Sequence, residues 1–244
     1  VLRTDRLREL PASAQEVQHV TALWRGAHGR GAGLDYQGAA ATESAFRAHC
    51  AGRAVLHLAT HGFFLQCAAA SGAPRTSGSR GANLAPPAVG HDSPLLRSGL
   101  VFAEAFGTTR GPDASDDGIL SAEEVGGLDL SQARLVVLSA CETGLGTIEG
   151  HEGLLGLRRA FAISGAGSVV ASLWPAGDRS TRALMQSFYI AWLQRGLEVP
   201  NALREASLER LRERRRSGRD SSPLYWATFV ATGVAPRHVD LRPY

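Results

Sequence analysis

The stretches VLHLATHG at residues 55–62 and LVVLSACETGLG at residues 135–146 decide the fold of this 244-residue chain. Each contains an apolar run, rich in Val and Leu, that is followed by Gly, which is typical of a strand buried on both faces of a parallel sheet. In open parallel sheets, ligands bind in the crevice outside the carboxyl ends of the strands. The sequence therefore predicts that His61 and Cys141 lie where chemistry takes place.

The composition is that of an ordinary globular protein, with 44% hydrophobic and 20% charged residues, which excludes a fibrous or largely disordered chain. No apolar stretch approaches the ~18–20 residues needed to cross a bilayer, and the start does not resemble a signal peptide. We therefore expect a cytoplasmic protein that does not contact a membrane. The net charge of +3 is small and does not favour direct contact with nucleic acid.

The cysteines of the chain favour reduced thiols. Cys50, Cys67 and Cys141 cannot all pair within one chain, and their irregular spacing fits neither a disulfide framework nor a zinc site. We expect free thiols, no bound metal and no cofactor.

Strand-like runs alternate with helix-like segments along the chain. Helical periodicity marks residues 13–25, 180–194 and 201–216. Such alternation predicts βαβ units and a mostly parallel sheet in an α/β protein. We expect a single domain over residues 1–244 that carries a low-complexity loop insertion at 66–93, and we expect the chain to be the C-terminal part of a longer protein.

Three candidate helix starts have the residues of N-terminal caps. Thr42 is placed to cap a short helix, and Ser121 with Glu124 three positions later matches a capping box. Ser13 and Glu16 have the same spacing, which predicts a capping box at the start of the first helix.

The pairing of His61 with Cys141 would supply the chemistry of a nucleophilic thiol. An unperturbed thiol has a pKa of about 8.5 and needs a nearby imidazole to form the thiolate at neutral pH. Neighbouring parallel strands lie about 4.8 Å apart, so side chains at their ends come within proton-transfer range. The N–H groups of Gly62 and Cys141 are the candidate oxyanion hole. Taken singly, each of the two side chains also suits an inert structural role.

Six blocks of the sequence resemble, in order, those of the CHAT-domain family, a bacterial branch of the caspase-like cysteine peptidases that is also similar to separases. They fall between about residue 13 and residue 233 and include VLHLATHGFF, PLLRSGLVFAEA, GILSAEEV, LVVLSACETGLG, EGLLGLRRAFAISGAGSVVASLWPAGD and YWATFVATG. The resemblance implies a caspase-like three-layer α/β/α sandwich and a dyad of His61 and Cys141. The caspase signature is matched only in part, because Ser139 replaces its Gln and the His lies 80 positions upstream rather than about 50.

The resemblance also implies a function, a cysteine endopeptidase that hydrolyses peptide bonds in protein or peptide substrates. It further implies regulation by an N-terminal or separate sensor domain such as tetratricopeptide repeats. The alternative is a catalytically inactive caspase-like scaffold that mediates protein interactions, because a fold alone does not fix an activity.

Substrate-binding residues are predicted from the segment SLWPAGD, which resembles the separase stretch that supplies an acidic pocket. It makes Asp178 a candidate for binding a basic substrate side chain and Trp174 a candidate pocket wall, with Ser139 two positions before the nucleophile as a third pocket residue. Asp178 suits equally well the N-cap of a helix that begins near Ser180.

Two further features have structural explanations. His57 is expected to be a packed histidine of the strand, on the same side as His61 by the period of two. The arginine-rich run at 203–219 carries an apolar stripe and interleaved glutamates, so we interpret it as a solvated helix face with ion pairs rather than a nucleic-acid site.

Overall fold

The computed structural model of the chain describes residues 10–29, 32–64, 95, 98–106, 117–139, 141–142, 152–174 and 177–233. The predicted loop insertion at 66–93 lies outside the described residues.

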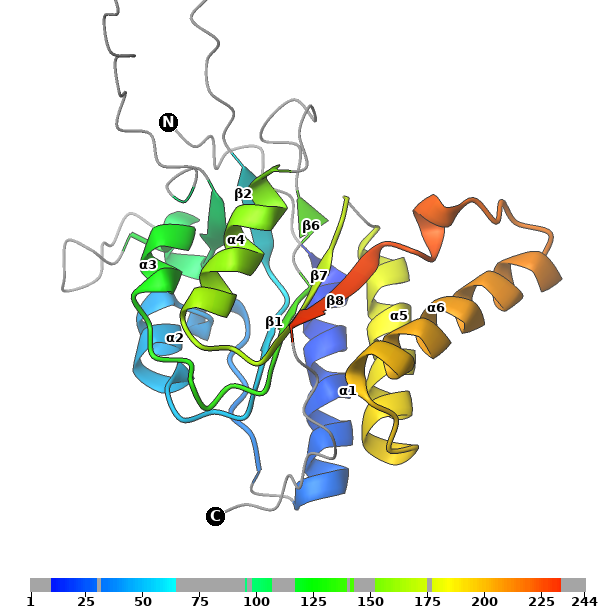
Figure 1. Ribbon diagram of the computed structural model, residues 1–244, viewed down its shortest axis with the longest axis horizontal. Coiled ribbons are helices and arrows are strands. Elements are labelled where there is room, and N and C mark those ends of the chain that lie inside the picture. Colours follow the sequence, from blue (N-terminus) through cyan, green and yellow to red (C-terminus); the bar gives the residue numbers. More distant parts are fainter. Residues whose placement is uncertain are drawn as a thin grey trace, which may run out of the picture.

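Four strands form a central sheet in the order β1-β5-β7-β8 (Figure 1). They are β1 (Val55–Leu58), β5 (Leu135–Leu138), β7 (Ser168–Ser172) and β8 (Phe229–Gly233). The first three run parallel, whereas β8 is antiparallel to β7. The mostly parallel sheet predicted from the buried apolar runs is confirmed.

A second sheet has the order β4-β3-β2-β6. Its strands are β2 (His61–Phe64), β3 (Ser98–Val101), β4 (Ile119–Ser121) and β6 (Cys141–Glu142). β2 follows β1 after two residues, and β6 likewise follows β5, so the same two lengths of chain contribute to both sheets. The sequence predicted that these runs would end at their reactive residues, but the chain continues as strand beyond each of them.

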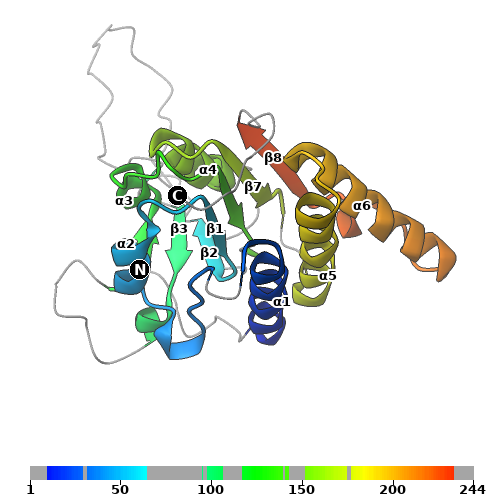
Figure 2. The same cartoon turned by 90° about the horizontal axis from the view of Figure 1, so that it is seen from below.

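Helices cover both faces of the central sheet, as Figures 1 and 2 show from two directions. One layer contains α2 (Glu43–Cys50), α3 (Ala122–Gly126) and α4 (Glu152–Ile163), and the other contains α1 (Pro11–His28), α5 (Asp178–Tyr189), the π-helix η5 (Ile190–Gln194) and α6 (Val199–Arg216). Short 3-10 turns are η2 (Gly38–Ala40), η4 (Ala103–Phe106) and η6 (Pro223–Tyr225). The fold is thus the predicted three-layer α/β/α sandwich of the caspase-like type.

The strand β5 shows how one apolar run fills both sides of the sandwich. Val136 and Leu138 pack into the core with α2, α3 and α4, whereas Leu135 and Val137 pack into the core with α1, α5 and α6. All four side chains are at most 3% exposed. Successive side chains of a strand point to opposite faces, so a strand between two helical layers has to be apolar at every position.

Two of the three predicted caps are confirmed. The Thr42 hydroxyl accepts a hydrogen bond from Ala45 N at 3.0 Å, and Ser121 with Glu124 forms a complete capping box at the start of α3. The predicted box of Ser13 and Glu16 is wrong. The first helix begins at Pro11 without a side-chain cap, the Ser13 hydroxyl donates to Leu10 O, and Glu16 is 2% exposed.

Candidate active site

His61 and Cys141 are direct neighbours across a parallel strand pair. β2 pairs with β6 in parallel, with His61 opposite Cys141 and Gly62 opposite Glu142. In both strand pairs, β1 with β5 and β2 with β6, the paired residues lie 80 positions apart in the sequence. The Cα atoms of such partners lie about 4.8 Å apart, and the two positions share one face of the sheet. The two residues of the predicted dyad therefore occupy directly adjacent backbone positions of one sheet.

β2 has a neighbouring strand on each side. His61 pairs with Val101 of the antiparallel β3 as well as with Cys141, and its side chain is 6% exposed. The hydroxyl of Thr60, the residue before it, donates to the carbonyl oxygen of Val101. Gly62 is likewise placed between Leu100 and Glu142. The predicted base and the predicted oxyanion donor therefore lie in an ordered strand rather than in a free loop.

The predicted pocket residues lie at the carboxyl edge of the central sheet. Ser139 directly follows β5 and is 5% exposed, and its hydroxyl has no hydrogen-bond partner within the described chain. Trp174 lies two residues beyond β7, and its indole N–H donates to Leu224 O at 3.1 Å. Since β5 and β7 are adjacent and parallel, these two residues lie at the same edge as Cys141.

Asp178 is the first residue of α5, and Gly177 is the N-cap of that helix. The alternative prediction, in which Asp178 itself is the N-cap, is therefore wrong. Its carboxylate instead accepts a hydrogen bond from Ala12 N at 2.7 Å, at the start of α1. A carboxylate in this position stabilises the N-terminal ends of two helices, because both present free N–H groups and a partial positive charge.

A buried polar cluster that the sequence analysis missed lies beside β1. The ring nitrogens of His57 lie 3.0 Å from the Tyr189 hydroxyl and 3.0 Å from a Glu16 carboxylate oxygen. The side chains of His57 and Glu16 are 8% and 2% exposed, and Tyr189 is fully buried. Burial, and to a lesser degree the charge of Glu16, raises the pKa of Tyr189 well above its usual value. The expectation that His57 is a packed histidine is confirmed.

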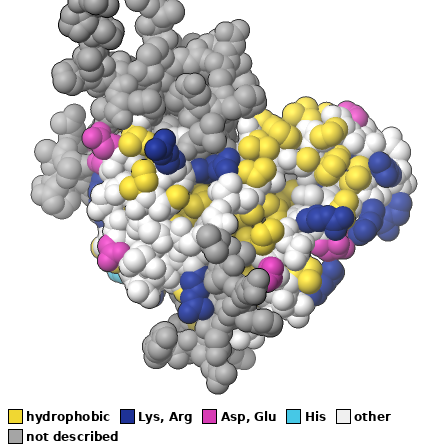
Figure 3. All heavy atoms as spheres, in the orientation of Figure 1, with side chains coloured by type: hydrophobic (Ala, Val, Ile, Leu, Met, Phe, Trp, Pro, Cys, Tyr) yellow, Lys and Arg dark blue, Asp and Glu magenta, His cyan; other side chains and the backbone are white. Residues whose placement is uncertain are grey.

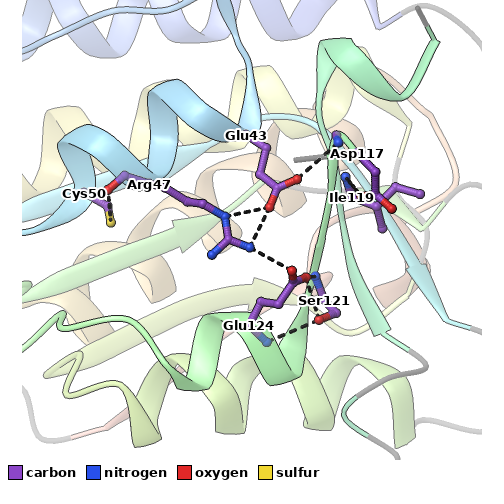
Figure 4. A network of polar contacts seen from close by, with 8 residues as sticks. Glu43, Arg47, Cys50, Asp117, Ile119, Ser121 and Glu124 are labelled. Atoms are coloured by element: carbon purple, nitrogen blue, oxygen red, sulfur yellow. Dashed lines mark hydrogen bonds and ion pairs between the residues drawn. The ribbon is translucent and has the colours of Figure 1, made fainter. Parts of the chain in front are cut away.

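A second missed cluster joins α2 to the second sheet (Figure 4). The fully buried Glu43 accepts hydrogen bonds from the Arg47 guanidinium at 2.7 Å and from Gly118 N at 3.1 Å. Arg47 also pairs with Glu124 of α3 at 2.8 Å. Gly118 in turn accepts from Phe102 N at 2.7 Å, next to the residue that pairs with His61. Glu43 therefore helps to hold the strands beside the candidate base.

A cavity of about 950 Å³ extends along β1 between α1 and α2 and reaches Thr60 and His61. Its walls include apolar side chains of both helices, such as Val17 and Phe46. No spacing in the sequence indicated this cavity, because its walls come from segments that meet only in the fold.

Among the described residues, no group of three or more His, Cys, Asp or Glu side chains is arranged to hold a metal ion. No helix in the same part of the chain has the length and apolar character needed to span a membrane.

The sequence is similar to a known protein and to a known domain family. Over 115 residues, 47% of the chain, the sequence is 33% identical to the mouse (Mus musculus) protein "Tetratricopeptide repeat protein 28". The match spans only 4% of the length of that protein. The family described as "CHAT domain" matches residues 2–234, which is nearly the whole sequence. The chain therefore belongs to the CHAT-domain family.

Proposed function

We propose that the chain is a cysteine endopeptidase domain that cleaves protein substrates through a dyad of His61 and Cys141. The observation that carries the proposal is the direct pairing of these two residues across the parallel strands β2 and β6. CHAT domains are related to caspase-like peptidases, which agrees with this reading. The reaction needs no cofactor or metal.

The proposed reaction is hydrolysis through a thioester. His61 takes the proton of the Cys141 thiol, and the thiolate attacks the scissile carbonyl carbon. His61 then gives that proton to the departing amine as the C–N bond breaks, and water hydrolyses the thioester. The N–H groups of Gly62 and Cys141 would stabilise the oxyanion of each tetrahedral intermediate. Because Gly62 has strand neighbours on both sides, its N–H would have to turn out of the sheet to do so.

The need for such a rearrangement supports regulation by a partner. The mouse relative is named as a tetratricopeptide repeat protein, and the chain corresponds to only 4% of its length. We infer that a repeat domain, in the same longer polypeptide or in a separate protein, switches the peptidase on in the cytoplasm. For the substrate pocket we retain Ser139 and Trp174. Asp178 stays a candidate as well, because Ala12 N binds one oxygen of its carboxylate and the other oxygen can accept from a basic side chain.

The proposal is tested by sequencing new N-termini after the protein is incubated with a proteome-derived peptide library. Wild type and the control Cys67→Ala should generate the same termini, whereas Cys141→Ala and His61→Ala should generate none. Gly62→Val should lower turnover about 100- to 1,000-fold, the usual effect of losing one oxyanion donor. Alkylation of Cys141 by iodoacetamide should persist in Gly62→Val.

The rival function is a catalytically inactive scaffold for protein interactions. The strand position of Gly62 between two neighbours favours it, because an oxyanion hole needs N–H groups that already point at the reacting carbonyl. If wild type and Cys141→Ala leave the library equally intact in the presence of a repeat partner, the endopeptidase proposal is wrong and the scaffold remains.

A further inference from the structure

The outer end of α6 carries an excess of positive charge. The helix contains six arginines and three glutamates. The structure pairs Arg210 with Glu213 and Arg212 with Glu205, which confirms the predicted ion pairs in part.

Four further arginines at the end of the helix have no carboxylate within ion-pair distance in the described chain, and we call this set the basic face. It consists of Arg214, Arg215, Arg216 and Arg219. The last three are exposed, and Figure 3 shows arginine side chains gathered at this end of the molecule beside apolar ones.

The basic face lies next to exposed apolar side chains of η6. Arg214 sits over the ring of Tyr225 at 3.9 Å and also donates to the carbonyl oxygen of Asp220. Leu224 and Tyr225 are 53% and 41% exposed. The end of α6 and the turn η6 therefore form one continuous surface that combines positive charge with apolar area.

This surface lies at the same edge of the central sheet as the proposed active site. β8 is antiparallel to β7, with Phe229 opposite Ser172, so η6 precedes β8 at the carboxyl edge of the parallel strands. Two hydrogen bonds link the segments, from Leu173 N to Thr228 O and from the Trp174 indole to Leu224 O. Figure 1 shows the end of α6 and η6 on the side toward which β7 points.

We propose that the basic face, with Leu224 and Tyr225, binds an extended acidic segment of the protein substrate outside the site of cleavage. As a substrate site it depends on the proposed endopeptidase function. β5 and β8 are two strand spacings apart, about 10 Å, and an extended peptide advances about 3.3 Å per residue. The acidic residues should therefore lie at least about three positions from the scissile bond.

Charge complementarity favours an acidic peptide over a nucleic acid. One face of the Tyr225 ring is already covered by Arg214, which leaves a single face for the base stacking that single-stranded nucleic acids use. Glu213 and Asp220 lie among the arginines and would repel a continuous row of phosphates. A peptide with spaced carboxylates and apolar side chains between them matches both the arginines and the exposed Leu224.

Binding can be measured without catalysis, in the Cys141→Ala protein. The probes are fluorescein-labelled peptides TEVEVET and TQVQVQT, followed by fluorescence anisotropy. The glutamate peptide should bind at least about tenfold more tightly than the glutamine peptide, from about three charge pairs. It should lose that advantage in the triple variant Arg215→Glu, Arg216→Glu, Arg219→Glu. The control is the triple variant Arg53→Glu, Arg195→Glu, Arg204→Glu, which replaces three exposed arginines outside the basic face and changes the net charge by the same amount. Its affinity for TEVEVET should stay within about twofold of that of the unsubstituted surface.

Several outcomes overturn the proposal: no binding of TEVEVET at millimolar concentration, equal binding of the two peptides, or an equal loss in the control. A single-stranded DNA 12-mer is compared with TEVEVET in the same assay. If the DNA binds more tightly than the peptide and the triple variant loses that binding, the basic face is a nucleic-acid site instead. If the wild type cleaves no substrate, and the binding of TEVEVET still depends on the basic face, the endopeptidase proposal fails. The acidic-peptide site then stands without its substrate role. If the enzyme cleaves, acidic residues should be enriched beside its cleavage sites, and the triple variant should lose that enrichment while Cys141 stays reactive.

Discussion

Glu43→Ala tests whether one buried carboxylate holds α2 against the strands beside the candidate base. The substitution removes the acceptor for Gly118 N and one of the two carboxylates that pair with Arg47. Gly118 is buried, so its N–H is left without a partner, which costs about 1–3 kcal/mol. Arg47 is 32% exposed and keeps Glu124, so the lost ion pair adds about 0.5–1 kcal/mol. We expect the free energy of unfolding to fall by about 1.5–4 kcal/mol.

Urea denaturation followed by circular dichroism measures the effect. With an m value of about 3 kcal/mol/M, a loss of 3 kcal/mol lowers the midpoint by about 1 M. Glu43→Gln keeps an oxygen that can accept from Gly118 N and should lose only about 1 kcal/mol. The exposed Glu123→Ala is the control and should stay within about 0.5 kcal/mol. Equal losses for Glu43→Ala and Glu43→Gln would show that the Gly118 hydrogen bond does not hold the helix.

Three other measurements follow from the structure. In the folded protein Tyr189 retains its proton above about pH 10, where the unfolded chain releases it, so stability falls as pH rises. Between about pH 9 and 11 the melting temperature should therefore fall less for Tyr189→Phe than for the wild type. An equal dependence on pH in the two proteins would show that Tyr189 does not cause the fall. Burial raises the pKa of the Cys50 thiol, so mass spectrometry at pH 8 should find Cys50 unmodified by iodoacetamide until urea unfolds the chain. Gly99→Ala would place a methyl group 2.5 Å from Leu120 O and should cost about 1–3 kcal/mol, which a second urea titration can refute by showing a wild-type midpoint.

Local sequence signals predicted the parts of the fold that depend on nearby residues. The apolar runs gave the buried strands, and the hydroxyls of Thr42 and Ser121 cap the helices that they were expected to cap. The register of His61 with Cys141 agrees with the expectation that two adjacent strands deliver both residues to one place. Each of these features follows from the period of a strand or from a hydrogen bond within one turn of helix.

Features that depend on distant partners were not predictable in this way. Glu16 has the spacing of a capping residue, but a partner 41 positions away, His57, binds its carboxylate instead. Asp178 has the spacing of a cap for its own helix, yet the N–H that its carboxylate binds belongs to Ala12, 166 positions away. A single sequence contains no signal for such pairs, because their proximity is produced by the packing of helices on the sheet.

The shared register of the two strand pairs determines where this chain can change in length. Between β1 and β2, and between β5 and β6, the chain has joints of equal length, two residues each. Deleting one residue from either joint would shift one strand by a single position and send its side chains to the opposite face. Connections that lie outside both joints and outside the strands can gain or lose residues without that effect. Insertions and deletions in relatives of this domain should therefore occur in its other connections and be absent from these two joints.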